Sequence, residues 1–87
     1  MARYAVIYKT SADKALRKLP TAVQVRIATA TDELGDNPRP RGCIKLKGEE
    51  DVWRIRVGDY RIVYTIEDDK LIVLVVRVAH RRDVYRD

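Results

Sequence analysis

The chain has 87 residues, of which 46% are hydrophobic and 36% are charged. This length fits one domain with a single modest core, and the composition is typical of a globular protein and excludes a disordered chain. The formal net charge of +5 favours polyanionic partners at neutral pH, although an ordinary solvated basic surface has the same balance.

The N-terminal half predicts one strand and two helices. Residues 4–8 (YAVIY) are β-branched and aromatic, which indicates an opening strand. Ser11 is a candidate N-cap for a helix that reaches Leu19, and Pro20 suits the first turn of a second helix. The second helix ends near Gly35, a candidate C-cap. Its apolar stripe consists of Val23, Ile27, Ala30 and Leu34.

The C-terminal half predicts strands joined by short turns. An irregular basic loop, 37–42, precedes a short candidate strand at 43–46, and residues 53–64 form a hairpin. Residues 71–79 are apolar on both faces, which is typical of a central strand. The predicted fold is an α+β domain with an N-terminal strand, a two-helix hairpin and a short C-terminal tail or helix. A mainly antiparallel three-strand meander completes a four-stranded sheet.

The predicted hairpin places arginines next to one another on one face. Strict alternation points Arg54 and Arg56 to the face opposite Trp53. A two-residue Gly-Asp loop then places Arg56 directly opposite Arg61. Like charges directly across a strand pair are destabilising, and a bound anion is the simplest physical reason to keep them. The hairpin therefore predicts an anion site with RNA as its favoured ligand; the alternative interpretation is a solvated outer face.

Further basic side chains could extend this site. Lys45 and Lys47 alternate in the same sense as the arginines, but they could equally keep a strand edge soluble. Histidine titrates near neutral pH, and His80 stands at the end of the last strand, where it suits a general base, a hydrogen-bond donor or an ordinary surface position. The candidate RNA-binding side chains are Lys45, Lys47, Arg82 and Arg86.

Tyr85 is a candidate stacking platform for a nucleobase, flanked by arginines that could hold phosphates. Its alternative role is to fold the tail back on the core. Other chemistries are excluded. Cys43 is the only cysteine and there is one histidine, so neither an internal disulfide nor a multi-cysteine metal site is predicted. The longest apolar run, 71–76, is too short to span a membrane, and no signal segment is predicted, so the expected location is a reducing cytoplasm.

The order of these segments resembles the RelE/ParE toxin superfamily. The resemblance rests on a Leu-Pro helical hairpin, a K-L-K-G segment, W-R-I-R-V-G-D-Y-R-I-V-Y and a closing H-R-R-D-V-Y-R. It covers essentially the whole chain as one domain, 1–87, and implies the toxin of a toxin–antitoxin pair. RelE-branch members cut mRNA in the ribosomal A site by attack of the ribose 2′-hydroxyl, without a metal or other cofactor. The implied partners are a RelB-like antitoxin, the 70S ribosome and mRNA.

The resemblance also implies roles for single residues. Arg61 matches an arginine implicated in stabilising transition-state charge, and Arg81 matches a basic residue assigned to leaving-group protonation or charge stabilisation. Tyr85 matches a tyrosine that stacks on a base of the message. Arg54 and Arg56 fall where the best-known branch has two lysines, one of which is the proposed general base.

A guanidinium does not act as a free base in proteins, which separates this chain from that branch. The resulting hypothesis makes His80 the acid/base and Arg81 its electrostatic neighbour, while Arg54 and Arg56 bind phosphate. Two other functions stay open. The ParE branch shares the fold but poisons DNA gyrase, and a basic RNA- or ribosome-binding module would bind without catalysis.

Overall fold

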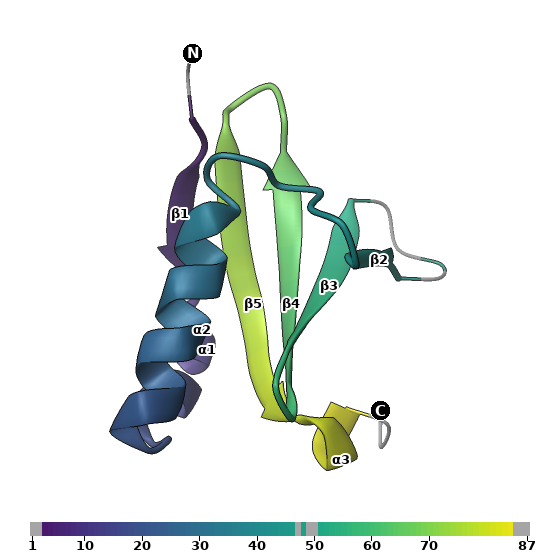
Figure 1. The fold of residues 1–87 in the computed structure, drawn as a ribbon. Coiled ribbons are helices and arrows are strands. Elements are labelled where there is room, and N and C mark those ends of the chain that lie inside the picture. The colour runs from purple at the N-terminus through teal and green to yellow at the C-terminus, as the bar shows by residue number, and fades with distance from the viewer. Residues whose placement is uncertain (1–2, 47, 49–50, 85–87) are drawn as a thin grey trace.

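A β-sheet with two helices packed on one face organises the chain (Figure 1). The computed structural model describes residues 3–46, 48 and 51–84. The strands are β1 (Ala5–Tyr8), β2 (Ile44–Lys45), β3 (Val52–Val57), β4 (Tyr60–Glu67) and β5 (Ile72–His80). The helices are α1 (Thr10–Arg17), α2 (Thr21–Glu33) and α3 (Arg81–Val84). No helix among the described residues is long and apolar enough to cross a membrane.

The strand order is β1-β5-β4-β3-β2, so β5 is an interior strand between β1 and β4, as the sequence predicted, and β4 is the middle strand. β1 pairs with β5 in parallel, and the other neighbours pair antiparallel. The α+β class, the helical hairpin and the meander are confirmed. The sheet has five strands instead of the predicted four, because Ile44 and Lys45 pair with Arg54 and Trp53 as a separate edge strand.

The helices begin close to the predicted positions, with one change at α1. Its N-cap is Lys9, and Ser11 lies inside the helix. Pro20 precedes α2 in an extended conformation, where a residue without an N–H costs nothing. The predicted stripe of α2 is confirmed, because Ile27 and Leu34 are fully buried in the core.

Gly35 has a different role from the predicted C-cap. α2 ends at Glu33, its C-cap Leu34 has a right-handed conformation, and Gly35 is not in the left-handed region. A Cβ on Gly35 would lie 2.9 Å from the carbonyl oxygen of Tyr4, and the Tyr4 N–H donates to the Gly35 carbonyl at 2.8 Å. Gly35 therefore lets the end of α2 approach the backbone just before β1.

The core lies between the helices and the inner face of the sheet. Its buried members are Ala12, Ile27, Leu34, Ile55, Ile62, Tyr64, Ile66, Val73, Val75 and Val78. Tyr64 is fully buried, and its hydroxyl donates to the carbonyl of Pro38 at 2.7 Å. Burial raises the pKa of Tyr64 well above its usual range. This bond attaches loop 37–43 to the middle of the sheet.

Candidate functional site

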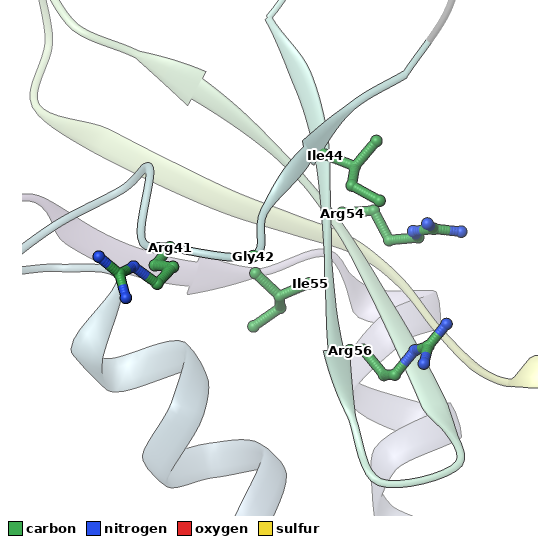
Figure 2. Close-up of a pocket in the computed structure, with 6 residues that line it drawn as sticks. All are labelled: Arg41, Gly42, Ile44, Arg54, Ile55 and Arg56. Carbon is green, nitrogen blue, oxygen red and sulfur yellow. The ribbon is translucent and has the colours of Figure 1, made fainter.

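The predicted arginine cluster forms on the sheet face opposite α1 and α2. The β3–β4 register pairs Arg56 directly with Arg61, and Arg54 with Val63. Figure 2 shows Arg54 and Arg56 pointing to one side of β3 while Ile55 points to the other. We call Arg54, Arg56 and Arg61 the arginine face. The register follows from the two-residue turn, in which Gly58 has φ 59°, as the first central residue of a type II′ turn requires.

The three guanidinium-bearing residues differ in exposure. Arg56 is exposed, Arg54 is half-buried, and Arg61 is only 3% exposed. Arg61 is the cross-strand neighbour of Arg56, so its buried guanidinium adds positive charge beside the exposed one. The arginine face therefore combines two accessible arginines with one that is buried.

The end of β5 brings Arg81 to the same end of the hairpin. Ala79 is the cross-strand partner of Arg61, and Arg81 follows two residues later. The Arg81 N–H donates to the Asp59 carbonyl at 2.7 Å, and Arg81 Nε lies 3.9 Å from Asp59 Oδ1. Arg82, which comes next, is exposed. The turn of the hairpin thus holds the start of α3 beside the arginine face (Figure 1).

His80 lies on the other face of the sheet. It pairs with Tyr60, and the two rings meet edge to face with centroids 5.3 Å apart. Its Nδ1 accepts the N–H of Arg82 at 3.4 Å. His80 lies on this face because β5 contains a bulge. Tyr64 pairs with Val75 and Val63 pairs with Arg77, so Val76 lies between the two pairs without a partner in the β4 register. The bulge shifts the alternation by one residue, so the last residues of β5 change face.

His80 borders a cavity of about 610 Å³ between α1 and the end of β5. Lys14 of α1 and Lys18, the C-cap of that helix, line it from one side. Arg77 and Asp83 line it near α3. The structure therefore separates the only histidine from the arginine face and places it in a basic groove beside the helices.

The two lysines predicted to extend the basic surface, Lys45 and Lys47, have different outcomes. Lys45 pairs with Trp53, so it lies on the helix-covered face, with its Nζ 5.9 Å from the centre of the Trp53 ring. Ile44, which is 49% exposed, pairs with Arg54 and takes the place beside the arginine face. Three predicted residues lie outside the described part of the chain: Lys47, Tyr85 and Arg86.

The sequence analysis missed a cluster that fixes the basic loop. Arg39 binds Asp68 through both terminal nitrogens, at 2.9 and 3.2 Å, and lies 5.3 Å from the centre of the Trp53 ring. The hydroxyl of Tyr4 donates to the same carboxylate at 2.5 Å. These hydrogen bonds, with Arg39 the main cause, lower the pKa of Asp68 to about 2. Only the proline and arginine content of 37–42 signalled the loop, and it did not reveal which arginine would be paired.

No group of three or more histidine, cysteine, aspartate or glutamate side chains that could hold a metal ion occurs within residues 3–46, 48 and 51–84. The side chains that define the arginine face are guanidiniums, and Arg81 lies at the same end of the hairpin. This donor set binds oxyanions such as phosphate.

Comparison with known proteins identifies the class. Residues 6–85 match the family model described as the ParE toxin of the type II toxin–antitoxin system parDE. Toxin RelG of Mycobacterium tuberculosis is 32% identical, over 95% of this chain and 97% of the relative. The mRNA interferase toxin RelE of Escherichia coli K12 is 31% identical, over 97% of this chain and 92% of the relative.

Solved structures agree with the sequence relatives. The archaeal RelE–RelB complex from Pyrococcus horikoshii superposes with a TM-score of 0.81 at 32% identity, over 91% of this chain and 96% of the compared chain. The chain therefore belongs to the RelE/ParE toxin superfamily, as its motifs indicated. It is a RelE-type toxin in both sequence and fold.

Proposed function

We propose that this protein is the toxin of a toxin–antitoxin pair and that it cleaves mRNA in the ribosomal A site without a metal ion. The observation that carries the proposal is the direct pairing of Arg56 with Arg61 on the sheet face that α1 and α2 leave uncovered. Two guanidiniums in direct register suit a phosphate, which accepts charge-assisted hydrogen bonds from arginine. The name of the Escherichia coli relative, mRNA interferase, supports an endoribonuclease.

In the proposed reaction the ribose 2′-oxygen attacks the adjacent phosphorus and expels the 5′-oxygen of the next nucleotide. Arg56 and Arg61 stabilise the charge that develops on the phosphorane oxygens. Arg81, which the turn holds at the same end of the hairpin, stabilises the departing 5′-oxygen. None of these guanidiniums removes the 2′-hydroxyl proton, because arginine stays protonated.

We assign that proton transfer to His80. A general base must lie within hydrogen-bond reach of the 2′-hydroxyl, and His80 lies on the helix-covered face, so this assignment places the scissile phosphate at the end of β5, beside Arg81 and at the rim of the arginine face. Nδ1 accepts the Arg82 N–H, so a neutral ring carries its proton on Nε2. As a base, His80 takes the proton at Nδ1 and gives up this hydrogen bond of 3.4 Å.

The partner proposal follows from the solved relatives. The archaeal relative was solved as a RelE–RelB complex, and we propose a RelB-like antitoxin for this chain as well. An acidic, amphipathic protein fits the net charge of +5. An open reading frame of that character beside the gene is the expected source.

A second candidate function is poisoning of DNA gyrase. The matching family model is described as a ParE toxin, and Arg54 and Arg56 stand where the RelE branch has lysines. A third, non-catalytic candidate is an RNA- or ribosome-binding module. It would lose affinity with salt when Arg61 or Arg81 is replaced, with no disproportionate loss of a chemical step.

The test adds purified protein to translating ribosomes and maps mRNA ends by primer extension. We expect A-site cuts with the wild type, loss of cuts with Arg61→Gln, and unchanged cuts with Arg17→Gln. Arg17 is a matched control because it is exposed on α1 and is paired with Asp13 of the same helix. Intact message together with trapped gyrase–DNA complexes would assign the ParE activity instead, and salt-dependent ribosome binding without cuts would assign the non-catalytic module.

A further inference from the structure

A cavity of about 320 Å³ opens at the edge of β3, next to the first residue of β2, Ile44. It exists because the two residues of β2 cover only Trp53 and Arg54, which leaves the β3 edge open from Ile55 onward. Figure 2 shows the residues that line it: Arg41, Gly42, Ile44, Arg54, Ile55 and Arg56. Two members of the arginine face form part of its wall, so the cavity is continuous with that face.

The loop that forms the other wall is firmly held. The Tyr64 hydroxyl binds the Pro38 carbonyl, Arg39 binds Asp68 twice, and the Cys43 N–H donates to the Pro40 carbonyl at 3.1 Å. A loop fixed in this way pays little ordering entropy when a ligand binds to it. The cavity is therefore a preformed feature of the fold.

Two arginines of this loop have different environments. Arg39 is committed to Asp68 and to the face of Trp53. Arg41 is exposed, lines the cavity, and makes no hydrogen bond or ion pair with any residue in the described part of the chain. The Arg39 guanidinium thus anchors the loop, and the Arg41 guanidinium is left available beside the arginine face.

The sign of the charge changes across the β3 edge. Arg54 and Arg56 lie on the arginine-face side, and Arg41 lies on the side towards α2 (Figure 2). Beyond Arg41 a second cavity, of about 410 Å³, is bordered by Glu33 and Asp36. A polyanionic strand that crosses the edge is attracted as far as Arg41 and repelled after it.

We propose that Arg41 binds a backbone phosphate of single-stranded RNA, next to the phosphate held by the arginine face. This inference rests on the proposed function and adds a second phosphate position to it. The nucleotide between the two phosphates occupies the 320 Å³ cavity, with Ile44 as its apolar contact. Arg41 is a binding residue and takes no part in proton transfer or in stabilising the phosphorane.

The test uses ribosomes programmed with synthetic mRNAs, each with one uncharged methylphosphonate linkage at a successive position in or beside the A-site codon. Arg41→Gln is compared with wild type and with Arg17→Gln in single-turnover cleavage. We expect Arg41→Gln to lower kcat/KM by about tenfold, the order expected for one charge-assisted contact, with kcat within about twofold.

At one position, an uncharged methylphosphonate linkage should lower kcat/KM of the wild type by the same tenfold factor. The same linkage should not lower kcat/KM of Arg41→Gln any further. The salt dependence of RNA binding should weaken by about 0.7 in log–log slope, the amount for one phosphate on a single strand.

Equal sensitivity of wild type and Arg41→Gln at every linkage would overturn the inference. So would a variant that cuts normally but binds the antitoxin more weakly, because the open β3 edge would then be a protein-binding surface. If the wild type cuts no message, the proposed function fails and this inference fails with it. If the wild type cuts and Arg41→Gln behaves as Arg17→Gln does, only the second phosphate position is lost.

Discussion

Two cross-strand pairs at the tip of the β3–β4 hairpin lie back to back and have contrasting chemistry. On the arginine face Arg56 opposes Arg61, two like charges in direct register. On the helix-covered face Tyr60 opposes His80, two rings in edge-to-face contact. The first pair juxtaposes like charges and favours a bound anion, whereas the second is a favourable ring contact. Adjacent residues of one strand, Tyr60 and Arg61, thus separate charge stabilisation from the candidate proton carrier.

This separation gives Arg81 a particular importance. It follows His80 directly and is tied to Asp59 in the turn that both pairs share. A phosphate on the arginine face can approach His80 only around the end of β5, and Arg81 stands at that end. Substitutions on each face should therefore have separable effects on stability and cleavage.

The largest effect is expected at the like-charge pair. Arg56→Gln should slow cleavage on ribosomes by roughly 10²–10³-fold, because a group that stabilises transition-state charge is lost. The same change should raise the free energy of unfolding by about 0.2–1 kcal/mol, because the cross-strand repulsion disappears. Single-turnover cleavage and urea denaturation measure the two quantities.

Arg54→Gln is the matched control, because Arg54 faces Val63 and opposes no charge. It should not gain stability. An Arg56→Gln protein that is less stable than wild type would show that the two guanidiniums are not in conflict.

His80→Gln should have the next largest effect, slowing cleavage by roughly 10²-fold, as for loss of a general acid–base group. It should also change the pH dependence of cleavage, because loss of a general base removes that group's ionisation from the pH–rate profile. Tyr60→Phe keeps the ring contact and serves as the control, with cleavage close to wild type. Cleavage by His80→Gln at the wild-type rate and pH profile would remove His80 from the mechanism.

The contrast between the faces also shows how far sequence reasoning reaches. The Arg56–Arg61 pairing was predictable because strand period and turn length are local properties. The position of His80 was not, because it depends on the bulge at Val76 in a strand whose two faces are both apolar. Such a strand carries no alternation from which a one-residue shift can be read.

The same limit applies to loop 37–43. Its composition predicted an irregular basic loop, but Arg39 is fixed by Asp68, 29 residues away in the chain. Arg39 and Arg41 have the same chemistry and nearly the same sequence neighbours, so only the folded structure separates them. Lys45 is a similar case, because its face depends on the partner that β2 finds in β3.

The smallest effect on cleavage is expected from a substitution of Asp59, the turn residue that contacts Arg81. Asp59→Asn keeps the backbone bond to the Arg81 N–H but removes the carboxylate 3.9 Å from Arg81 Nε. Both side chains are largely exposed, and such a pair contributes only about 0.2–1 kcal/mol, so cleavage should slow by roughly two- to fivefold. A double-mutant cycle with Arg81→Gln separates positioning from a general charge effect, because Asp59→Asn should have no effect once Arg81 is absent. If Asp59→Asn instead speeds cleavage in both backgrounds, Asp59 acts by repelling the message, and Arg81 is oriented by its backbone alone.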